Sequence, residues 1–545
     1  MDQQYKTPDV YIVEQDAFPN TVVAVETAIP AFIGYTEKAR DGNAARKYKP
    51  TRIESLTDYV KVFGGPYKPL FSLKQSDDKT HYVTAQNLES RFFLYYAVSL
   101  YFANGGGPAY VISVGNYSDA VLNGKNVKDF TPDPDPNDLT LVAPFDALKK
   151  VQDVTLLVAP DTVLFDSPAA CYGFWEAALA HCNTMRSRMA MIDIYGGDKQ
   201  RTYDDQTDVI SGEPFGFREM IGTDFLNYGV AYYPWVNFDV VDESKVTYAN
   251  LDSDSLGVLR QALADELAAT NPQPSVSQQQ KMQKLFSGLS LLVNDPVTNS
   301  ALTDDKGNPL PDDKGNTAAN AAAAAAVIAR IHNQLTAVSP LYKTLAADML
   351  AHPNLLPPCG AMAGVYARTD SNKGVYVAPA NTSISLAVTP AVDITAEDQE
   401  DLNMPLDGRA VNAIRTIPGR GLVVWGARTL DGNSGDWRYV SVRRTMIMLE
   451  QSAKAATMAY VFAPNVSTTW VAVEAMISNF LYTMWRSGAL AGSKPEDAYD
   501  VQVGLGSTMS GQDVIDGYMR VTIRVAVTHP AEFVELNFQQ KMQVS

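Results

Sequence analysis

The sequence predicts a mixed α/β protein of several domains, and three observations lead to this prediction. At 545 residues the chain exceeds a single hydrophobic core, because domains cluster at roughly 100 to 200 residues. Apolar residues make up 46% of the chain and charged residues 19%, which is typical of a folded globular protein. Between residues 90 and 236, apolar runs of strand length alternate with helical patterns, which favours a doubly wound α/β core.

The first 36 residues contain two short extended segments, at 10–14 and at 31–36. The first follows Thr7 and Pro8, and because proline cannot donate to a ladder, we expect this strand to begin at a sheet edge. With so few residues before it, the segment is predicted to be an arm. Its candidate pairing residues are Val10, Tyr11, Ile12 and Val13.

The predicted core begins with a helix that starts near residue 90 and ends at the glycines 105–107, before a strand at 109–114. Because these glycines follow a helix and precede a strand, their order is the reverse of a dinucleotide-binding loop, and they indicate a turn. The next predicted elements are strands at 154–160, 189–195 and 230–236, with a helix at 169–185.

Residues 240–352 are predicted to be helical. Leucines 256, 259, 263 and 267 recur at helical spacing, and the stretch 318–350 is rich in alanine. Between these helices, DDKGN occurs twice, at 304–308 and 312–316, and its turn-forming residues indicate an exposed loop. The carboxylates raise the alternative of a calcium site, but the spacing and distal glutamate of an EF-hand loop are missing.

In the last third, Gly419 to Gly421 indicate a turn before the strand 422–425. A helix follows, with Arg443 and Arg444 at its predicted solvent edge and an apolar body at 445–449. A second helix carries a broad apolar face around 473–485 and ends at the glycines 488–492. Pro495 then begins a short helix whose charged residues are Lys494, Glu496 and Asp497.

The C-terminus alternates apolar and polar residues in two segments. Residues 518–529 form one predicted half-buried strand, with Met519, Val521, Ile523, Val525 and Val527 on one face. A second alternation follows Pro530 and leads into a polar tail at 540–545. We expect this end to be a second arm, with the candidate pairing residues Phe533, Val534, Leu536 and Phe538.

Several function classes are disfavoured by composition. The net charge of −17 argues against nucleic-acid binding, which depends on clustered Lys and Arg. The N-terminus does not have the pattern of a secretory signal, and no window reaches the ~18 apolar residues of a membrane span. The three cysteines are predicted to be reduced, and the five histidines lack metal-ligand spacing. No catalytic, cofactor-binding or metal-binding residue is therefore predicted.

Blocks of sequence in a fixed order resemble a known family. They are TPDVYIVE at 7–14, TAIPAFIGYT at 27–36, YGVAYYPWV at 228–236, GVYARTDSNKGVYVAPANTSI at 364–384, VNAIRTIPGRGLVVWGARTL at 411–430, WRY at 437–439, FAPN at 462–465, LYTMWRSGALAGSKPEDAYDV at 481–501 and PAEFV at 530–534. Together they resemble the contractile tail sheath family of myophage-like tails, R-type bacteriocins and extracellular contractile injection systems. Asp9, where the family commonly has glycine, and residues 453–460 depart from its pattern.

The resemblance implies a multi-domain sheath subunit with an inner α/β domain formed by both termini, a middle α/β domain, a helical insertion and extended N- and C-terminal β-arms. The expected divisions are 1–36 for the N-terminal arm and first strands, 37–239 for the α/β sheath region, 240–352 for a helical, variable outer insertion, 353–529 for the C-terminal sheath domain and 530–545 for the C-terminal arm.

The resemblance also implies a function and partners. The chain is expected to polymerise helically, in stacked rings of six, around an inner tube, and to contract from an extended metastable state to drive that tube through a target envelope. Its expected partners are further copies of itself, the inner tube protein, baseplate and terminal cap proteins and paralogous sheath subunits. Assembly is expected in the bacterial cytoplasm, as part of a phage tail or a released phage-tail-like particle.

Alternatives remain open at this point. Lys494, Glu496 and Asp497 are candidates for contact with the tube, or else form a solvated helix cap. A static filament or shell protein would share the arms and would have one packing of its subunits, and an α/β enzyme would use the core at 150–236. The residues do not separate a phage tail from a bacteriocin or an injection system.

Overall fold

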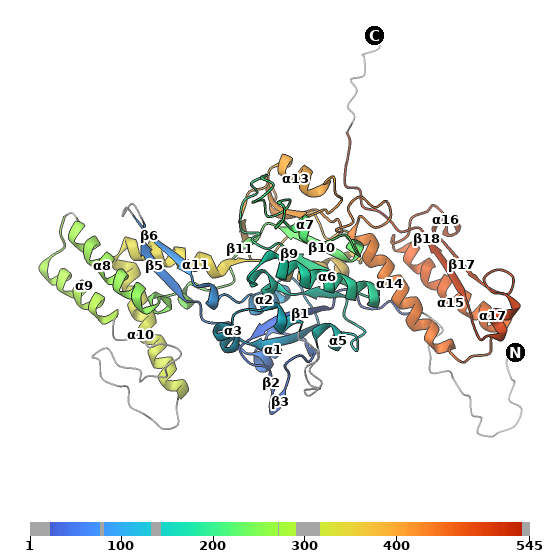
Figure 1. Cartoon of the computed structure of the whole chain (residues 1–545), viewed down its shortest axis with the longest axis horizontal. Coiled ribbons are helices and arrows are strands. Elements are labelled where there is room, and N and C mark those ends of the chain that lie inside the picture. The colour runs from blue at the N-terminus through green and yellow to red at the C-terminus, as the bar shows by residue number, and fades with distance from the viewer. Residues whose placement is uncertain (1–21, 77–80, 132–142, 271, 290–316, 537–545) are drawn as a thin grey trace, which may run out of the picture. The chain divides into compact units, whose positions relative to one another are not determined.

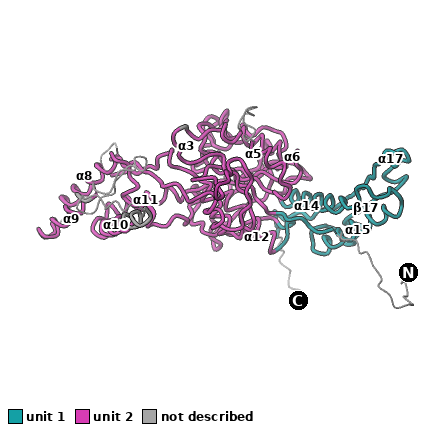
Figure 2. Tube along the Cα trace, turned by 90° about the horizontal axis from the view of Figure 1, so that it is seen from below, with its two compact units in different colours: residues 1–27, 373–377, 441–545 teal, residues 28–372, 378–440 magenta. Residues whose placement is uncertain are grey.

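The computed structural model describes residues 22–536, with gaps at 77–80, 132–142, 271 and 290–316 (Figure 1). The predicted arm at 10–14, the duplicated loop at 304–316 and Phe538 lie outside the described residues. The chain divides into two compact units (Figure 2), a large one formed by residues 28–372 and 378–440 and a small one formed by residues 1–27, 373–377 and 441–545. The divisions at residues 36, 239, 352 and 529 stay a prediction.

A nine-stranded sheet forms the centre of the large unit. Its order is β13–β16–β15–β10–β9–β8–β1–β7–β4, and the six strands from β15 to β7 run parallel. The strands are β1 (Pro30–Thr36), β4 (Thr51–Ile53), β7 (Ala109–Asn116), β8 (Leu156–Val158), β9 (Met189–Asp193), β10 (Gly229–Tyr233), β13 (Thr382–Ser383), β15 (Asn412–Ile417) and β16 (Gly421–Trp425). The predicted mixed α/β class is confirmed.

The central strands are fully buried because they lie inside a parallel sheet that is covered on both faces. Every residue of β1, β8, β9 and β10 is buried, which explains why their sequences are continuous apolar runs. The helix α6 (Pro168–Met185) packs against β9 and begins at Ser167, whose side chain accepts a hydrogen bond from the Ala170 backbone N–H. The predicted helix at 169–185 is thus confirmed.

Two glycines allow a close helix contact beside the sheet. In α12 (Cys359–Lys373), a Cβ at Gly360 would lie 2.6 Å from the Ala97 Cα in α2 (Leu94–Ala103). A Cβ at Gly364 would lie 2.4 Å from the Tyr101 carbonyl oxygen of α2. Any side chain at either position would push the two helices apart.

The described residues between 240 and 352 are predominantly helical, as predicted. They form α8 (Ser253–Ala269), α9 (Val276–Gly288), α10 (Thr317–Val338) and most of α11 (Pro340–Asn354). Leu256, Leu259, Leu263 and Leu267 are buried on one side of α8. The hairpin of β5 (Phe71–Gln75) and β6 (Tyr82–Gln86) packs against α8 and α11 (Figure 1).

The remaining elements of the large unit are short. They are β2 (Arg40–Asp41), β3 (Ala44–Ala45), β11 (Val236–Phe238), β12 (Leu355–Leu356), β14 (Ala387–Pro390), α1 (Leu56–Phe63), α3 (Tyr117–Asn123), α4 (Val127–Phe130), α5 (Pro144–Leu148), α7 (Phe217–Met220) and α13 (Ala396–Asn403). Single turns of 3-10 helix lie at Leu88–Ser90, Pro160–Leu164, Leu226–Tyr228, Glu243–Lys245 and Tyr248–Asn250.

The small unit is a helix packed on a two-stranded antiparallel sheet. Its elements are most of α14 (Val440–Thr457), a 3-10 turn (Met458–Tyr460), α15 (Ser467–Arg486), α16 (Pro495–Ala498), β17 (Tyr499–Val503), α17 (Gly511–Ile515) and β18 (Val521–Val525). β17 pairs with β18, and α15 packs against β17 through a face that includes Val473, Ile477 and Phe480. The predicted helix and the strand within 518–529 are confirmed.

The predicted position of Arg443 and Arg444 at the solvent edge of a helix is wrong. Each is 4% exposed in α14. The Arg444 Nη2 donates to the Thr27 carbonyl oxygen at 2.8 Å, so a backbone acceptor far away in the sequence stabilises its buried charge. Helical periodicity alone cannot reveal such an acceptor.

Candidate functional site

The carboxyl ends of β8 and β9, where α/β enzymes commonly bind ligands, hold two fully buried carboxylates. Asp161 follows β8 and accepts hydrogen bonds from the backbone N–H groups of Tyr35 at 2.8 Å and Phe93 at 2.6 Å. Burial raises its pKa to about 6. Both oxygens thus accept from backbone donors of neighbouring segments, and Asp161 acts as an anchor between β1, α2 and β8.

Asp193 at the end of β9 has the same kind of role. Its Oδ1 accepts from the Cys359 backbone N–H at 2.9 Å, at the start of α12. Burial raises the pKa of Asp193 to about 7, and burial together with this carboxylate raises the pKa of the Cys359 thiol. Cys171, Cys182 and Cys359 are free and buried, as predicted for reduced cysteines.

The histidines form structural contacts. Burial, with Arg188 nearby, lowers the pKa of His181 to about 4, so its ring is neutral and stacks on Phe145. His332 shares a hydrogen bond of 2.8 Å with the Tyr342 hydroxyl. Over the described ranges, no group of three His, Cys, Asp or Glu side chains is placed to hold a metal ion. A search of the described helices also finds none that is long and apolar enough to span a membrane.

The C-terminal arm residues that the structure describes are strongly exposed. Phe533 is 70% exposed, Val534 76% and Leu536 71%. Residues 530–536 pair with no strand among the described residues. The alternating pattern predicted for this segment therefore has no strand to pair with within the described part of its own chain, and three large apolar side chains face solvent.

The sheet of the small unit has open edges. β17 and β18 pair only with each other among the described strands, and a bridge between Leu490 and Val527 extends the same pairing. Ile523 of β18 is 38% exposed. Unpaired strand edges of this kind are templates for the addition of a further strand.

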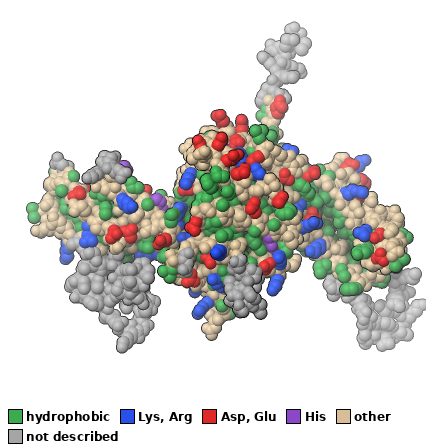
Figure 3. Space-filling model, viewed as in Figure 1, with side chains coloured by type: hydrophobic (Ala, Val, Ile, Leu, Met, Phe, Trp, Pro, Cys, Tyr) green, Lys and Arg blue, Asp and Glu red, His purple; other side chains and the backbone are tan. Residues whose placement is uncertain are grey.

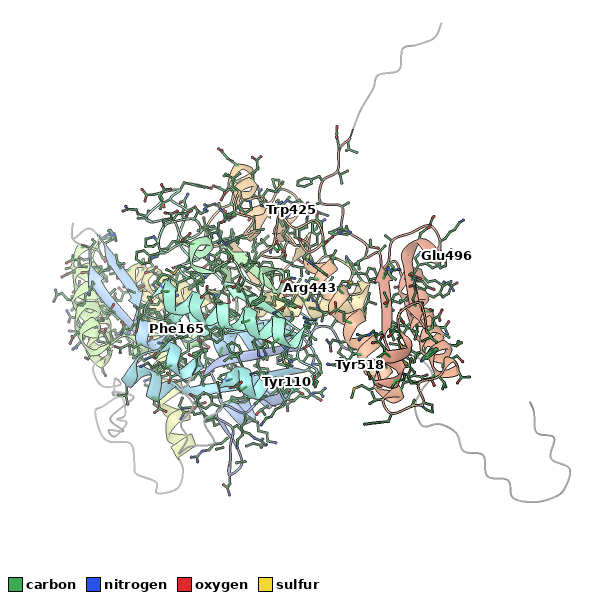
Figure 4. All side chains as sticks on the ribbon, turned by 45° about the vertical axis from the view of Figure 1, so that its right-hand side comes forward. Tyr110, Phe165, Trp425, Arg443, Glu496 and Tyr518 are labelled. Atoms are coloured by element: carbon green, nitrogen blue, oxygen red, sulfur yellow. The ribbon has the colours of Figure 1, made fainter. Side chains whose placement is uncertain are left out.

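The three candidate tube-contact residues lie on one exposed turn. Lys494 is the N-cap residue of α16, and Glu496 and Asp497 occupy its first turn. All three are exposed, and Asp497 Oδ2 accepts a hydrogen bond from the Ser493 hydroxyl at 3.1 Å. Figure 4 shows Glu496 at one end of the small unit and Tyr518 at the other. The structure thus brings the three residues together and leaves their contact role a prediction.

An exposed apolar loop at 458–466 was not predicted as a site. Phe462 is 102% exposed, Met458 67% and Val461 61%. The Asn465 side chain holds the loop in place, because its Oδ1 accepts from Trp470 Nε1 at 2.7 Å and its Nδ2 donates to the Tyr518 carbonyl oxygen at 3.0 Å. The signal in the sequence was a run of apolar residues beside the turn formers Pro464 and Asn465.

Comparison with known proteins agrees with an assembly role. Residues 433–541 match the family model of the phage tail sheath C-terminal domain. Two structures of the anti-feeding prophage, its six-fold symmetrised baseplate and its helical sheath in the contracted state, each contain a chain 25% identical to this one with a TM-score of 0.54. The first alignment covers 99% of this chain and 100% of that chain, and the second covers 98% and 100%.

A third similar chain comes from the sheath complex of an extracellular contractile injection system, PVC, in the contracted state. It is 24% identical with a TM-score of 0.52, and the alignment covers 99% of both chains, a likeness that bears on the fold. A search of curated proteins found no match. The fold and these comparisons support a structural role in a contractile sheath assembly. Residues 433–541 match the tail sheath family, and the likeness of the rest of the chain to chains of the anti-feeding prophage sheath and baseplate supports the same family.

Proposed function

We propose that the chain is the sheath subunit of a contractile tail-like particle, which polymerises helically around an inner tube and contracts to drive the tube through an envelope. The observation that carries this proposal is the likeness, over 98% of this chain, to a chain of the contracted helical sheath of the anti-feeding prophage. A structural role, without catalysis, follows from the same likeness.

The C-terminal arm supplies the link between subunits. An arm strand that adds to the open edge of β17 or β18 in a neighbouring copy gains main-chain hydrogen bonds along its length. Burial of Phe533, Val534 and Leu536 adds roughly 1.5–3 kcal/mol for each side chain before the cost of ordering the arm. The N-terminal arm at 10–14 is proposed to pair in the same manner.

Contraction is proposed to draw its energy from two packings of the same subunits, without nucleotide hydrolysis. A difference of a few kcal/mol per subunit, over on the order of a hundred copies, is enough to move the tube. The arms keep the polymer continuous because their connections bend while the compact units dock in a new arrangement.

The tube contact is proposed to lie at Lys494, Glu496 and Asp497. Exposed ion pairs contribute about 0–1 kcal/mol each, so an attachment of this kind releases readily when the subunits move outward. Their exposure on a single turn supports this role. A solvated helix cap would leave tube binding unchanged when the three charges are removed.

The wider partners follow from the related particles. One similar chain belongs to a six-fold symmetrised baseplate, which supports stacked rings of six and contact with a baseplate. Terminal cap proteins and paralogous sheath subunits complete the proposed set. Assembly is proposed in the bacterial cytoplasm, before release of the particle.

Substitution Leu536→Asp tests the arm link. The side chain is exposed in the single subunit, so the change should leave its unfolding curve intact while it blocks burial in a neighbour. Wild-type protein should form filaments in electron micrographs, and the variant should stay as single subunits in sedimentation. The control is Leu122→Asp, at a side chain that is 81% exposed in α3. Filaments of normal length from Leu536→Asp protein would contradict the arm link.

A further inference from the structure

Two segments of the large unit, at opposite sides of it in Figure 1, each carry charge of mainly one sign. Residues 38–52, which run through β2 and β3 into β4, carry six basic side chains and one acidic one, whereas the whole chain has only 44 Lys and Arg among 545 residues. Residues 393–407, around α13, carry six acidic side chains and no basic one. We name these the basic segment and the acidic segment. Figure 1 places β2 and β3 at the bottom of the large unit and α13 at its top.

Most cations of the basic segment form no ion pair among the described residues. Lys38, Arg40, Lys47, Lys49 and Arg52 are exposed and form no ion pair with any described residue. Only Arg46 pairs, with Asp41 at 3.1 Å. Among the described strands, β2 and β3 pair only with each other, and Figure 3 shows basic side chains around this hairpin.

The acidic segment is anchored through Asp401 and carries exposed carboxylates on its outer side. Asp401 is held from within by Arg201 Nη1 at 2.5 Å and Arg218 Nη1 at 3.0 Å, which fixes α13 to the large unit. Asp393, Glu397 and Glu400 are exposed and make no ion pair within the described ranges. Beside them, Leu406 is 104% exposed and Met404 58% exposed, so the same surface carries an apolar part. Acidic side chains gather over this end in Figure 3.

We infer that the acidic segment of one copy binds the basic segment of the next copy, in a head-to-tail contact. The occupant is a second copy because the two surfaces have opposite charge and lie at opposite ends of one unit, the arrangement that generates open helical polymers. A nucleic acid fits less well, since the chain as a whole carries a net charge of −17 and repels phosphate. This inference rests on the proposed function and names a second contact, separate from the arms.

Charge reversal with compensation tests the contact. The double variants Lys47→Glu/Lys49→Glu and Glu397→Lys/Glu400→Lys should each raise about tenfold the concentration at which filaments appear at low salt. The quadruple variant that carries all four changes should return toward wild type, because the opposite charges face each other again. The control is Lys281→Glu/Lys343→Glu, at exposed lysines of α9 and α11, which should have little effect. Equal defects in the quadruple and double variants would overturn the inference.

Cysteine cross-linking separates this contact from the proposed function. Protein with Lys47→Cys, mixed with protein with Glu397→Cys and treated with a mild oxidant, should give a disulfide-linked pair, because the native cysteines are buried and do not compete. The control mixture contains protein with Lys343→Cys in place of protein with Lys47→Cys. It should give at least tenfold less of the disulfide-linked pair. Cross-linking without filaments would support the contact while the sheath function fails. Filaments without the specific cross-link would overturn the contact and leave the sheath function standing.

Discussion

At the scale of the residue, we expect Asp193 to make the stability of the chain depend on pH. Its raised pKa of about 7 means that the folded state binds a proton more readily than the unfolded state between roughly pH 4 and 7. Stability should therefore increase as the pH falls from 8 toward 5. This direction is opposite to that of a carboxylate stabilised by an ion pair, whose pKa is lowered by folding.

Substitution Asp193→Asn checks this effect. Asparagine keeps an oxygen that accepts from the Cys359 N–H and carries no charge, so the variant should be more stable than wild type at pH 8, by on the order of 1–3 kcal/mol. At pH 5 the two proteins should be nearly equal. Urea unfolding at both pH values measures the difference, and an equal pH slope for both proteins would contradict the account.

A substitution at Phe462 tests assembly without a large effect on folding. Because this side chain is 102% exposed in the single subunit, Phe462→Asp should change the free energy of unfolding by less than about 0.5 kcal/mol. If the loop at 458–466 is covered by a neighbour, the same change should prevent filament formation. Sedimentation and thermal unfolding measure the two effects, with Leu122→Asp as the matched control. Normal filaments from the variant would show that this loop stays in solvent.

At the scale of the element, glycines in two helices of the large unit should respond in opposite directions to alanine. Gly360→Ala in α12 forces a Cβ to within 2.6 Å of α2 and should destabilise the fold by about 1–3 kcal/mol. Gly173→Ala in α6 meets no atom within 4 Å and should stabilise by up to about 1 kcal/mol, because alanine favours the helix. Chemical denaturation compares the two variants. Equal effects would show that α12 and α2 do not pack as described.

The sequence predicted the positions of helices and strands better than the burial of single side chains. Apolar runs located β1, β8, β9 and β10, because strands inside a covered parallel sheet have no polar face. The leucine spacing predicted α8 because the leucines form the buried side of this helix. Burial of Arg443 and Arg444 was missed, since a distant backbone acceptor leaves no local pattern.

The candidate site residues stay a prediction. The apolar alternation at 533–536 indicated an arm, and the structure shows that Phe533, Val534 and Leu536 are exposed, without showing what they contact. The acidic and basic segments were not singled out, because a net charge averages over the chain and only the fold brings the two segments to opposite ends of one unit. The loop at 458–466 was missed because exposure of Phe462 depends on the hydrogen bonds of Asn465.

At the scale of the whole molecule, the two kinds of proposed contact have different roles in a contractile polymer. The arms provide links that persist, since strand addition buries main-chain groups and large apolar side chains. The charged contacts between subunits break and form again during contraction, because each exposed ion pair is weak and sensitive to salt. A sheath with both kinds of contact is able to rearrange without falling apart.

The most direct test of this account is electron microscopy of purified assemblies before and after a trigger such as mild guanidinium or acid, with sheath length and diameter measured on the same preparation. The account predicts that the sheath shortens and widens while the polymer stays continuous. Filaments of constant length and diameter up to the point of dissolution would contradict it and would indicate a static filament.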